Sequence, residues 1–372
     1  MTALTIERLQ VAGFKTIQQL DLELRPINVL IGANGAGKSN LISLFTLMNR
    51  IARESLQLYV AQAGGADALL YYGRKTTDQL KITIWFRQTD TLRNGYACTL
   101  VPTDDDRLIF AEETIFFHDC SAHKQPYDVV KRHPHPESWL PDWKYRGKKI
   151  AAHVLSAMHS WQVYHFHDTG PGARVKRPGD LHDNERLHPD AGNLAAFLYR
   201  LRETHPRHYR AIVETVRLAA PFFADFALRP NPLNPETIRL EWRDRGSDEP
   251  FGPHMLSDGT LRFICLATLL LQPAELRPST IVLDEPELGL HPYAIALLAD
   301  MVRKAASQTQ VLLATQSVTL INQFDPEDLI VVDRTGPAST FRRLSADELS
   351  AWLEEYSLGD LWEKNVLGGR PS

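Results

Sequence analysis

The sequence predicts an α/β fold in which a mixed, mostly parallel central sheet carries an antiparallel β lobe and an inserted region of helices and loops. Three observations predict this class. The apolar run INVLIG at residues 27–32 enters a glycine-rich turn and then an amphipathic helix, which is typical of a buried strand, a loop and a helix in succession. Strand-like segments follow up to about residue 117. From residue 257 onward, helices alternate with short apolar strands.

The same periodicities predict the individual elements. Residues 3–31 alternate or run apolar as strands do, and the helix after the glycine-rich turn is expected to begin near Gly37 and to include Met48. The segments QLKITIWF, NGYACTLV and RLIFAEETIFF predict antiparallel strands. The remaining expected elements are helices at 191–202 and 207–219, strands around 225–230 and 237–244, a helix after Ser257, a strand at 280–285, a helix from about Pro292, a strand at 310–315 and a last β/α stretch.

These elements divide the chain into four expected regions. Residues 1–117 hold the first part of the α/β unit and the β lobe, 118–222 an inserted helical and loop subdomain, 223–344 the second part of the unit, and 345–372 a C-terminal helix and tail. The inserted stretch is rich in His, Pro, Trp and basic residues up to about residue 186, so much of it is interpreted as loop.

Composition narrows the class of protein. An apolar fraction of 44% in 372 residues is sufficient for a large core, and a formal charge of −4 argues against wholesale coating of nucleic acid while allowing a local basic patch. The three cysteines, Cys98, Cys120 and Cys265, have no paired spacing, which favours a reducing cytoplasm over a disulfide framework or a cysteine zinc site. No apolar run approaches the roughly 18 residues of a membrane span, and the N-terminus lacks a signal-peptide pattern, so neither membrane insertion nor export is expected.

The segment GANGAGKS at residues 32–39 matches the phosphate-loop pattern at every fixed position and lies between a predicted strand and a predicted helix. The glycines allow backbone N–H groups to surround phosphates, Lys38 can reach the terminal phosphate oxygens, and the Ser39 hydroxyl can ligate Mg²⁺. We therefore expect ATP and Mg²⁺ as cofactors. The residues expected to contact the nucleotide here are Asn34, Gly35, Gly37, Lys38, Ser39 and Asn40.

The segment TIVLDEPELGLHP supplies two acids at the end of a buried strand. In open α/β sheets ligands bind at the carboxyl ends of the strands, so both acids are expected beside the phosphate loop. Asp284 is the candidate metal-binding residue, and Glu285 is the candidate catalytic residue that faces the attacking water. A solvated strand end is the alternative, and the upstream phosphate loop argues against it.

The three segments GANGAGKS, LSDGT and IVLDEPELGLHP, in this order, resemble the Walker A, signature and Walker B/D-loop segments of ATP-binding-cassette (ABC) ATPases, specifically of the RecF/SMC/OLD-like branch. The first 40 residues also resemble the start of that branch, and the likeness covers roughly residues 3–50 and 250–335. It implies a P-loop head of the ABC-ATPase type. It also implies ATP-dependent head-to-tail dimerisation, in which the signature of one copy covers the ATP on the Walker A of the other.

The signature-like turn assigns Ser257, Asp258 and Gly259 to the nucleotide of a partner copy. Ser257 can cap a helix and contact phosphate, and Gly259 permits close approach of the backbone. An ordinary helix cap is the alternative for this turn taken alone. The family has glycine where Asp258 stands, so a negative charge lies near a phosphate unless a cation or Arg262 offsets it. The family often has histidine where Gln316 stands; this glutamine is assigned a catalytic role in positioning water, and it cannot be a general base.

Other residues are left with open assignments. His291 either belongs to the D-loop or caps the helix at Pro292. Gln88 and Gln162 are two weak candidates for the Q-loop glutamine. The histidines of the insertion show no metal-ligand spacing, so no metal site is expected there. The basic run Arg174, Lys176, Arg177 and Arg186 is interpreted as a solvated loop or a contact for phosphates or an acidic partner, and Trp139, Trp143 and Trp161 favour a partner surface.

The function expected from this resemblance is an ATPase that acts as a nucleotide switch, as the sensor subunit of a multi-protein bacterial anti-phage system with a separately encoded effector protein. The alternative is a RecF-like repair ATPase that clamps duplex DNA. An OLD-like nuclease is not expected, because only about forty residues follow Asp333 and a TOPRIM domain needs more. Long coiled-coil arms of the SMC type are also absent from the sequence.

Overall fold

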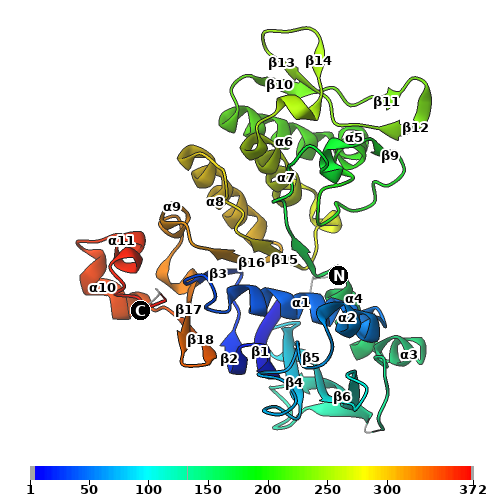
Figure 1. Ribbon diagram of the computed structural model, residues 1–372, viewed down its shortest axis with the longest axis vertical. Coiled ribbons are helices and arrows are strands. Elements are labelled where there is room, and N and C mark those ends of the chain that lie inside the picture. Colours follow the sequence, from blue (N-terminus) through cyan, green and yellow to red (C-terminus); the bar gives the residue numbers. More distant parts are fainter. Residues whose placement is uncertain (1–4, 132, 370–372) are drawn as a thin grey trace.

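The computed structural model describes residues 5–131 and 133–369 and consists of two lobes that flank a central sheet (Figure 1). The sheet has six strands in the order β18-β17-β3-β16-β15-β8, all parallel except β18. Their bounds are Ala338–Arg343 for β18, Leu329–Thr335 for β17, Ile27–Ile31 for β3, Gln310–Thr315 for β16, Thr280–Asp284 for β15 and Gln162–Tyr164 for β8. The mixed, mostly parallel central sheet predicted from the sequence is confirmed.

The first lobe contains an antiparallel sheet in the order β2-β1-β4-β5-β6-β7. Its strands are β1 (Thr5–Phe14), β2 (Ile17–Glu23), β4 (Leu80–Arg87), β5 (Leu92–Pro102), β6 (Leu108–Asp119) and β7 (Tyr127–Lys131). In β4 buried and less buried residues alternate strictly, so one face packs on the core while the other is open. The β lobe predicted beside the phosphate loop is confirmed.

Helices α1 (Lys38–Ala52), α2 (Leu56–Ala63), α3 (Leu140–Tyr145) and α4 (Lys149–Ser160) complete this lobe. The second lobe holds α5 (Leu194–Thr204), α6 (Pro206–Ala219) and α7 (Asp258–Leu271), with two small sheets. The short strands are β9 (Gly179–Asp180), β10 (Phe223–Phe226), β11 (Pro230–Asn231), β12 (Asn234–Ile238), β13 (Trp242–Asp244) and β14 (Pro250–Phe251). The last part of the chain adds four helices. Helix α8 (Pro292–Ala306) follows β15, α9 (Val318–Ile321) follows β16, and α10 (Ala346–Leu353) and α11 (Leu358–Glu363) follow β18.

The central sheet is buried on both faces because alternate residues of its strands belong to different cores. In β3, Leu30 belongs to the core of the first lobe, whereas Val29 and Ile31 belong to the core that continues into the second lobe. This double burial explains why INVLIG is a continuous apolar run. No helix in the described part of the chain is both long and apolar enough to cross a membrane.

The region expected as one inserted subdomain at 118–222 is divided between the two lobes. Its first part, including α3 and α4, packs into the first core up to Val163, and the second core begins at Tyr164. The stretch predicted as loop thus contributes two helices and the edge strand β8. The expectation that the tryptophans form a partner surface is wrong for two of them: Trp143 and Trp161 are 6% and 2% exposed, and Trp161 packs against Phe45.

Candidate active site

The glycine-rich turn joins the carboxyl end of β3 to the first turn of α1, and its glycines are required by geometry. Gly35 and Gly37 have φ of 79° and 122°, which side chains rarely adopt. A Cβ on Gly32 would lie 2.2 Å from the Val332 carbonyl oxygen, so the loop can pass close to β17 only with glycine there. A Cβ on Gly35 would meet nothing within 4 Å, so the loop backbone faces open space at that point.

The start of α1 is suited to an anion. Its N-cap, Gly37, offers no side-chain acceptor, so the N–H groups of Lys38 and Ser39 and the positive end of the helix dipole are available to a phosphate, whereas the Asn40 N–H donates to the Gly37 carbonyl at 3.1 Å. Lys38 is 6% exposed, and its Nζ donates to the carbonyl oxygens of Gly32 at 2.6 Å and Ala33 at 3.0 Å. Burial lowers the pKa of Lys38, while Glu285 and Asp284 oppose that shift, so the ammonium lies in the field of the two acids.

A hydrogen-bond network fixes the loop against β18 and the β1–β2 turn. Asn40 Nδ2 donates to the Thr16 hydroxyl at 2.6 Å, and the hydroxyls of Thr16 and Ser339 lie 2.7 Å apart. The Ser339 hydroxyl also donates to the Ala36 carbonyl at 2.6 Å. The expected ligand Asn40 therefore holds the loop in this structure, whereas Asn34 and Ser39 are exposed.

The two acids lie at the same edge of the sheet as the loop, because β3, β16 and β15 are parallel neighbours. Asp284 ends β15, and burial raises its pKa, opposed by His165 and reinforced by Glu285. Glu285 adopts φ of 42°, a left-handed conformation that costs a non-glycine residue about 1 kcal/mol or more. The chain thus turns sharply after Asp284, so that one carboxylate lies at the end of the strand and the next lies in the turn.

Gln316 connects this acid to the phosphate loop. Its Nε2 donates to Asn34 Oδ1 at 2.7 Å and to Glu285 Oε1 at 2.8 Å. These three residues are assigned in the sequence to three different motifs, and the structure brings them into one chain of hydrogen bonds. The position of Gln316 follows from β16, whose last residue, Thr315, is paired with Ile31 at the end of β3.

Two further groups at this edge were given no role from the sequence: His165, which belongs to no motif, and Glu287, which lies within the segment TIVLDEPELGLHP. The register that pairs Leu283 with Tyr164 puts His165 beside Asp284, immediately after β8. Glu287 is 9% exposed; Thr315 donates its hydroxyl to Oε1, and Oε2 has no hydrogen-bond partner among the residues that the structure describes. Burial raises the pKa of Glu287. The only signal for His165 in the sequence is the short apolar strand before it.

The signature-like turn lies at the start of α7, in the other lobe (Figure 1). The hydroxyl of Ser257 accepts from the Thr260 N–H at 3.1 Å, so Ser257 is an N-cap, and it remains exposed. A Cβ on Gly259 would lie 2.3 Å from the Gly289 carbonyl oxygen, so this glycine lets the turn contact the segment after Glu285. Within the described residues, no hydrogen bond or ion pair joins Ser257–Gly259 to the phosphate loop of the same chain.

The charge of Asp258 is offset by Lys176. Their Nζ and Oδ1 atoms are 3.3 Å apart, and the Lys176 side chain is 7% exposed. Arg262 is not the direct partner: its Nε donates to the Phe166 carbonyl at 2.9 Å. The basic run of the sequence is thereby split, since Lys176 supports the turn whereas Arg177 is exposed.

The structure gives the positions of His291, Gln88 and Gln162. His291 caps α8, accepting from the Tyr293 N–H at 3.3 Å. Gln88 accepts from Asn94 in the β lobe, and Gln162 lies at the start of β8, so neither is beside Asp284. Among the described residues no group of three His, Cys, Asp or Glu side chains could hold a metal ion.

Two family models match the chain. One, described as "AAA domain, putative AbiEii toxin, Type IV TA system", matches residues 154–322, and one described as "Protein of unknown function (DUF2813)" matches residues 4–91. The OLD nuclease of Thermus scotoductus is 24% identical over 353 residues, which cover 88% of this chain and 62% of that relative. The chain therefore spans less than two thirds of the length of this relative.

Solved structures of Smc heads have the same fold. The Smc head bound to the C-winged helix domain of ScpA has a TM-score of 0.60 at 15% identity, covering 92% of this chain and 99% of that chain. The Smc head with an extended coiled coil from Pyrococcus furiosus has a TM-score of 0.58 at 14% identity, covering 95% and 99%. Together, the family models, this relative and the solved structures support an ABC-like ATPase head of the RecF, SMC and OLD branch.

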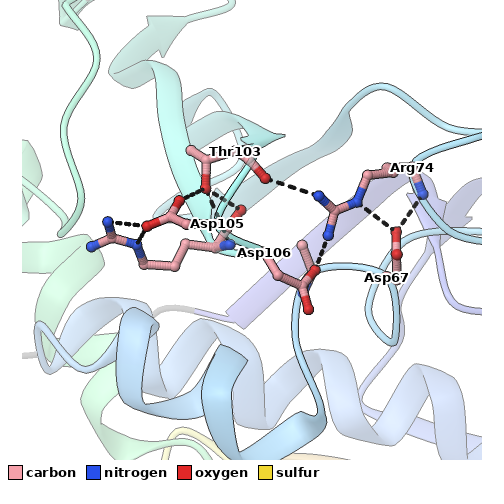
Figure 2. A network of polar contacts seen from close by, with 7 residues as sticks. Asp67, Arg74, Thr103, Asp105 and Asp106 are labelled. Carbon is pink, nitrogen blue, oxygen red and sulfur yellow. Dashed lines mark hydrogen bonds and ion pairs between the residues drawn. The ribbon is translucent and has the colours of Figure 1, made fainter.

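A cavity of about 770 Å³ adjoins the phosphate loop of the head, lined among others by Lys15, Asn40, Tyr72 and Arg74. Figure 2 shows the network that fixes its wall. Arg74 donates to Asp67 at 2.7 Å and 3.1 Å, to the Thr103 carbonyl at 3.0 Å, and to Asp106. These bonds fasten the segment after α2 to the β5–β6 turn, so the cavity has a preformed wall beside α1.

Proposed function

We propose that the head binds ATP with Mg²⁺ at the phosphate loop and hydrolyses it. The observation that carries this proposal is the convergence of Lys38, Asp284, Glu285 and Gln316 at one sheet edge, with Gln316 bonded both to the loop and to Glu285. The fold supports nucleotide binding, and the uncapped α1 terminus fits a phosphate.

Each side chain has a distinct role in this proposal. The loop N–H groups and Lys38 bind the terminal phosphates, and the cavity lined by Tyr72 and Arg74 accepts the rest of the nucleotide. Ser39 and Asp284 would hold Mg²⁺, which supplies charge neutralisation on the phosphates. These donors fit the ion, because a hydroxyl and one carboxylate with phosphate oxygens are typical of Mg²⁺ in P-loop proteins.

Glu285 is the proposed general base. It is one residue beyond the metal-binding carboxylate, and the left-handed turn directs it toward Gln316. Gln316 orients Glu285 by donating from its Nε2, and its Oε1 can accept a hydrogen bond from the attacking water. Because an amide does not ionise, the proton from that water is taken by Glu285.

We further propose that two heads join head to tail around ATP. The turn lies in the lobe opposite the loop, and its residues Ser257 and Asp258 are exposed and open to a second copy. Three large apolar side chains around this turn and the segment after Glu285 are strongly exposed, with Met255 at 67%, Leu288 at 51% and Tyr293 at 53%. Exposed apolar groups beside a helix N-terminus suit a surface that closes on a partner and its phosphate.

A mixing experiment tests the composite site. Lys38→Ala removes the phosphate contact, and Ser257→Asp keeps a helix cap while placing a negative charge against the phosphate of the partner. Each variant alone is expected to be inactive. An equimolar mixture should recover about a quarter of the parent rate, because half of the dimers are mixed and each has one intact site. Two inactive variants that stay inactive on mixing, while both bind each other with ATP, would refute the composite site.

For the biological role we propose the ATPase or sensor subunit of a bacterial defence system, with a separate effector protein. The description of the matching model as a toxin of a toxin–antitoxin system supports this class. The alternative is a head that clamps duplex DNA. This alternative is supported by a relative that is described as a nuclease. Salt-dependent stimulation of ATP hydrolysis by duplex DNA in the parent would favour the clamp. Failure of the ATP-bound Glu285→Gln variant to bind duplex DNA at low salt, together with no stimulation of the parent, would exclude it.

A further inference from the structure

A second cavity lies at the edge of the central sheet opposite the phosphate loop. It has a volume of about 790 Å³ and adjoins another of about 870 Å³, with which it shares Glu7, Leu24, Arg25 and Arg87. Arg25 precedes β3, whereas the phosphate loop follows that strand, so the two sites are separated by five strand residues, or about 17 Å. The cavity is therefore distinct from the proposed ATP site.

Arginines dominate the charge of this cavity. Five of them line it against three acids. Arg8 binds Asp21 at 2.6 Å, and Glu7 alone serves both Arg87 at 2.7 Å and Arg93 at 2.9 Å. Five arginines and three acids give the lining a net charge of +2, and the third acid, Glu23, forms no ion pair with Arg25 or Arg343 among the described residues.

Arg25 and Arg343 have no ion pair with a carboxylate among the described residues. Arg343 is half-buried and donates only to neutral oxygens, those of Glu327 at 2.8 Å, Glu23 at 2.9 Å and the Asn28 side chain at 2.6 Å. Its buried Nε has no hydrogen-bond partner in the described part of the chain. Burial and then the charge of Arg25 lower the pKa of Arg343 to about 10, with Asp328 and Glu23 in opposition.

An aromatic surface adjoins these charges. Trp85 lines the cavity on the open face of the antiparallel sheet, with its ring 4.4 Å from that of Phe116 and 6.4 Å from that of His118. The Phe116 ring lies over Gly95, where a Cβ would be 1.9 Å from it. The indole is thus held in place at the side of the arginine cavity. Phosphate-binding arginines next to a fixed aromatic ring are the combination by which proteins hold nucleotide units.

We propose that this cavity binds a nucleotide unit, with its phosphate between Arg25 and Arg343 and its base against Trp85. An anion there relieves the repulsion between the two guanidinium groups. Guanidinium groups remain charged at neutral pH, so the repulsion between Arg25 and Arg343 persists there. The unit comes either from a single strand of nucleic acid or from a free nucleotide.

Fluorescence anisotropy at low salt tests the proposal with two probes, a labelled ten-residue oligodeoxythymidine and a labelled AMP. All proteins carry Lys38→Ala, so binding at the phosphate loop cannot contribute and failure of the ATPase proposal does not affect the result. Arg25→Gln, whose exposed side chain makes no hydrogen bond in the described structure, is expected to weaken binding about fivefold. Glu7→Gln frees Arg87 and Arg93 from their shared carboxylate and is expected to tighten binding about fivefold.

Arg210→Gln is the matched control, because Arg210 is exposed on α6 in the other lobe. Binding of the oligonucleotide alone identifies a strand as the ligand, and binding of AMP alone identifies a free nucleotide. The proposal is overturned if neither probe binds below about 1 mM, or if Arg25→Gln and Glu7→Gln bind as the Arg210→Gln control does. Thermal unfolding of the three variants within about 2 °C of one another confirms that changes in affinity are not caused by unfolding.

Discussion

Glu285→Gln is the substitution that most directly separates binding from chemistry in this head. The amide keeps an oxygen at the position that accepts from Gln316 at 2.8 Å, so the hydrogen-bond chain to Asn34 can persist. The left-handed conformation at φ of 42° is equally strained in parent and variant. What is removed is the negative charge and the ability to take a proton.

The expected magnitudes follow from these differences. Loss of a general base should lower the hydrolysis rate by a factor of about 10² to 10⁴. The stability of the protein should change by less than about 1 kcal/mol, because the hydrogen bond is retained. ATP affinity should be unchanged or higher, since a negative charge beside Asp284 and the phosphates is lost. The ATP-bound dimer should therefore live longer than that of the parent.

The assay is release of inorganic phosphate with Mg²⁺, together with nucleotide retention and molecular size on gel filtration with and without ATP. Glu236→Gln is the control, because Glu236 is an exposed carboxylate paired with His182 in the other lobe. If Glu285→Gln hydrolyses ATP at more than about a tenth of the parent rate with unchanged affinity, Glu285 is not the general base. A protein that remains a monomer with ATP in both forms would refute the dimerisation mechanism.

Three further outcomes are expected. Lys176→Gln should weaken the ATP-dependent dimer, and Asp258→Asn should rescue it, with a coupling of about 0.5–1 kcal/mol in a double-mutant cycle of dimer dissociation constants. Gly37→Ala should abolish ATP binding and lower the melting temperature, because its Cβ would lie 2.2 Å from the Ser339 hydroxyl at φ of 122°; normal binding by calorimetry would contradict this. Glu287→Gln should gain stability relative to the parent as pH rises above 4.5, the ordinary pKa of Glu287, because burial raises the folded-state pKa and penalises the ionised form; denaturant unfolding at pH 4 and 8 measures it.

The sequence predicted those parts of the site that are contiguous in the chain. The phosphate loop was predicted from its spacing because eight adjacent residues supply the turn, the lysine and the helix start. Asp284 was predicted because it ends a run of buried residues. The Gln316 contact with Asn34 could not be predicted, since it joins residues separated by 282 positions in the chain. His165 was missed because its place beside Asp284 depends on the pairing of β8 with β15.

The tryptophans of the inserted stretch illustrate the same limit. Their neighbours in sequence are charged and polar, which favoured a surface role, but Trp161 packs on α1 and β4 through Phe45 and Phe86. Burial of an aromatic residue in a segment without clear periodicity depends on contacts far along the chain, and local composition does not report them.

The sequence by itself determined the fold class, the phosphate loop and the two carboxylates, because local hydrophobic periodicity and short motifs carry that information. The tertiary structure decided which distant groups meet. It paired Lys176 with Asp258, linked Gln316 to Glu285, and, within the described residues, left Arg25 and Arg343 without an ion pair. Such contacts follow from strand order and lobe packing, which emerge only when the whole chain has folded around its doubly buried sheet.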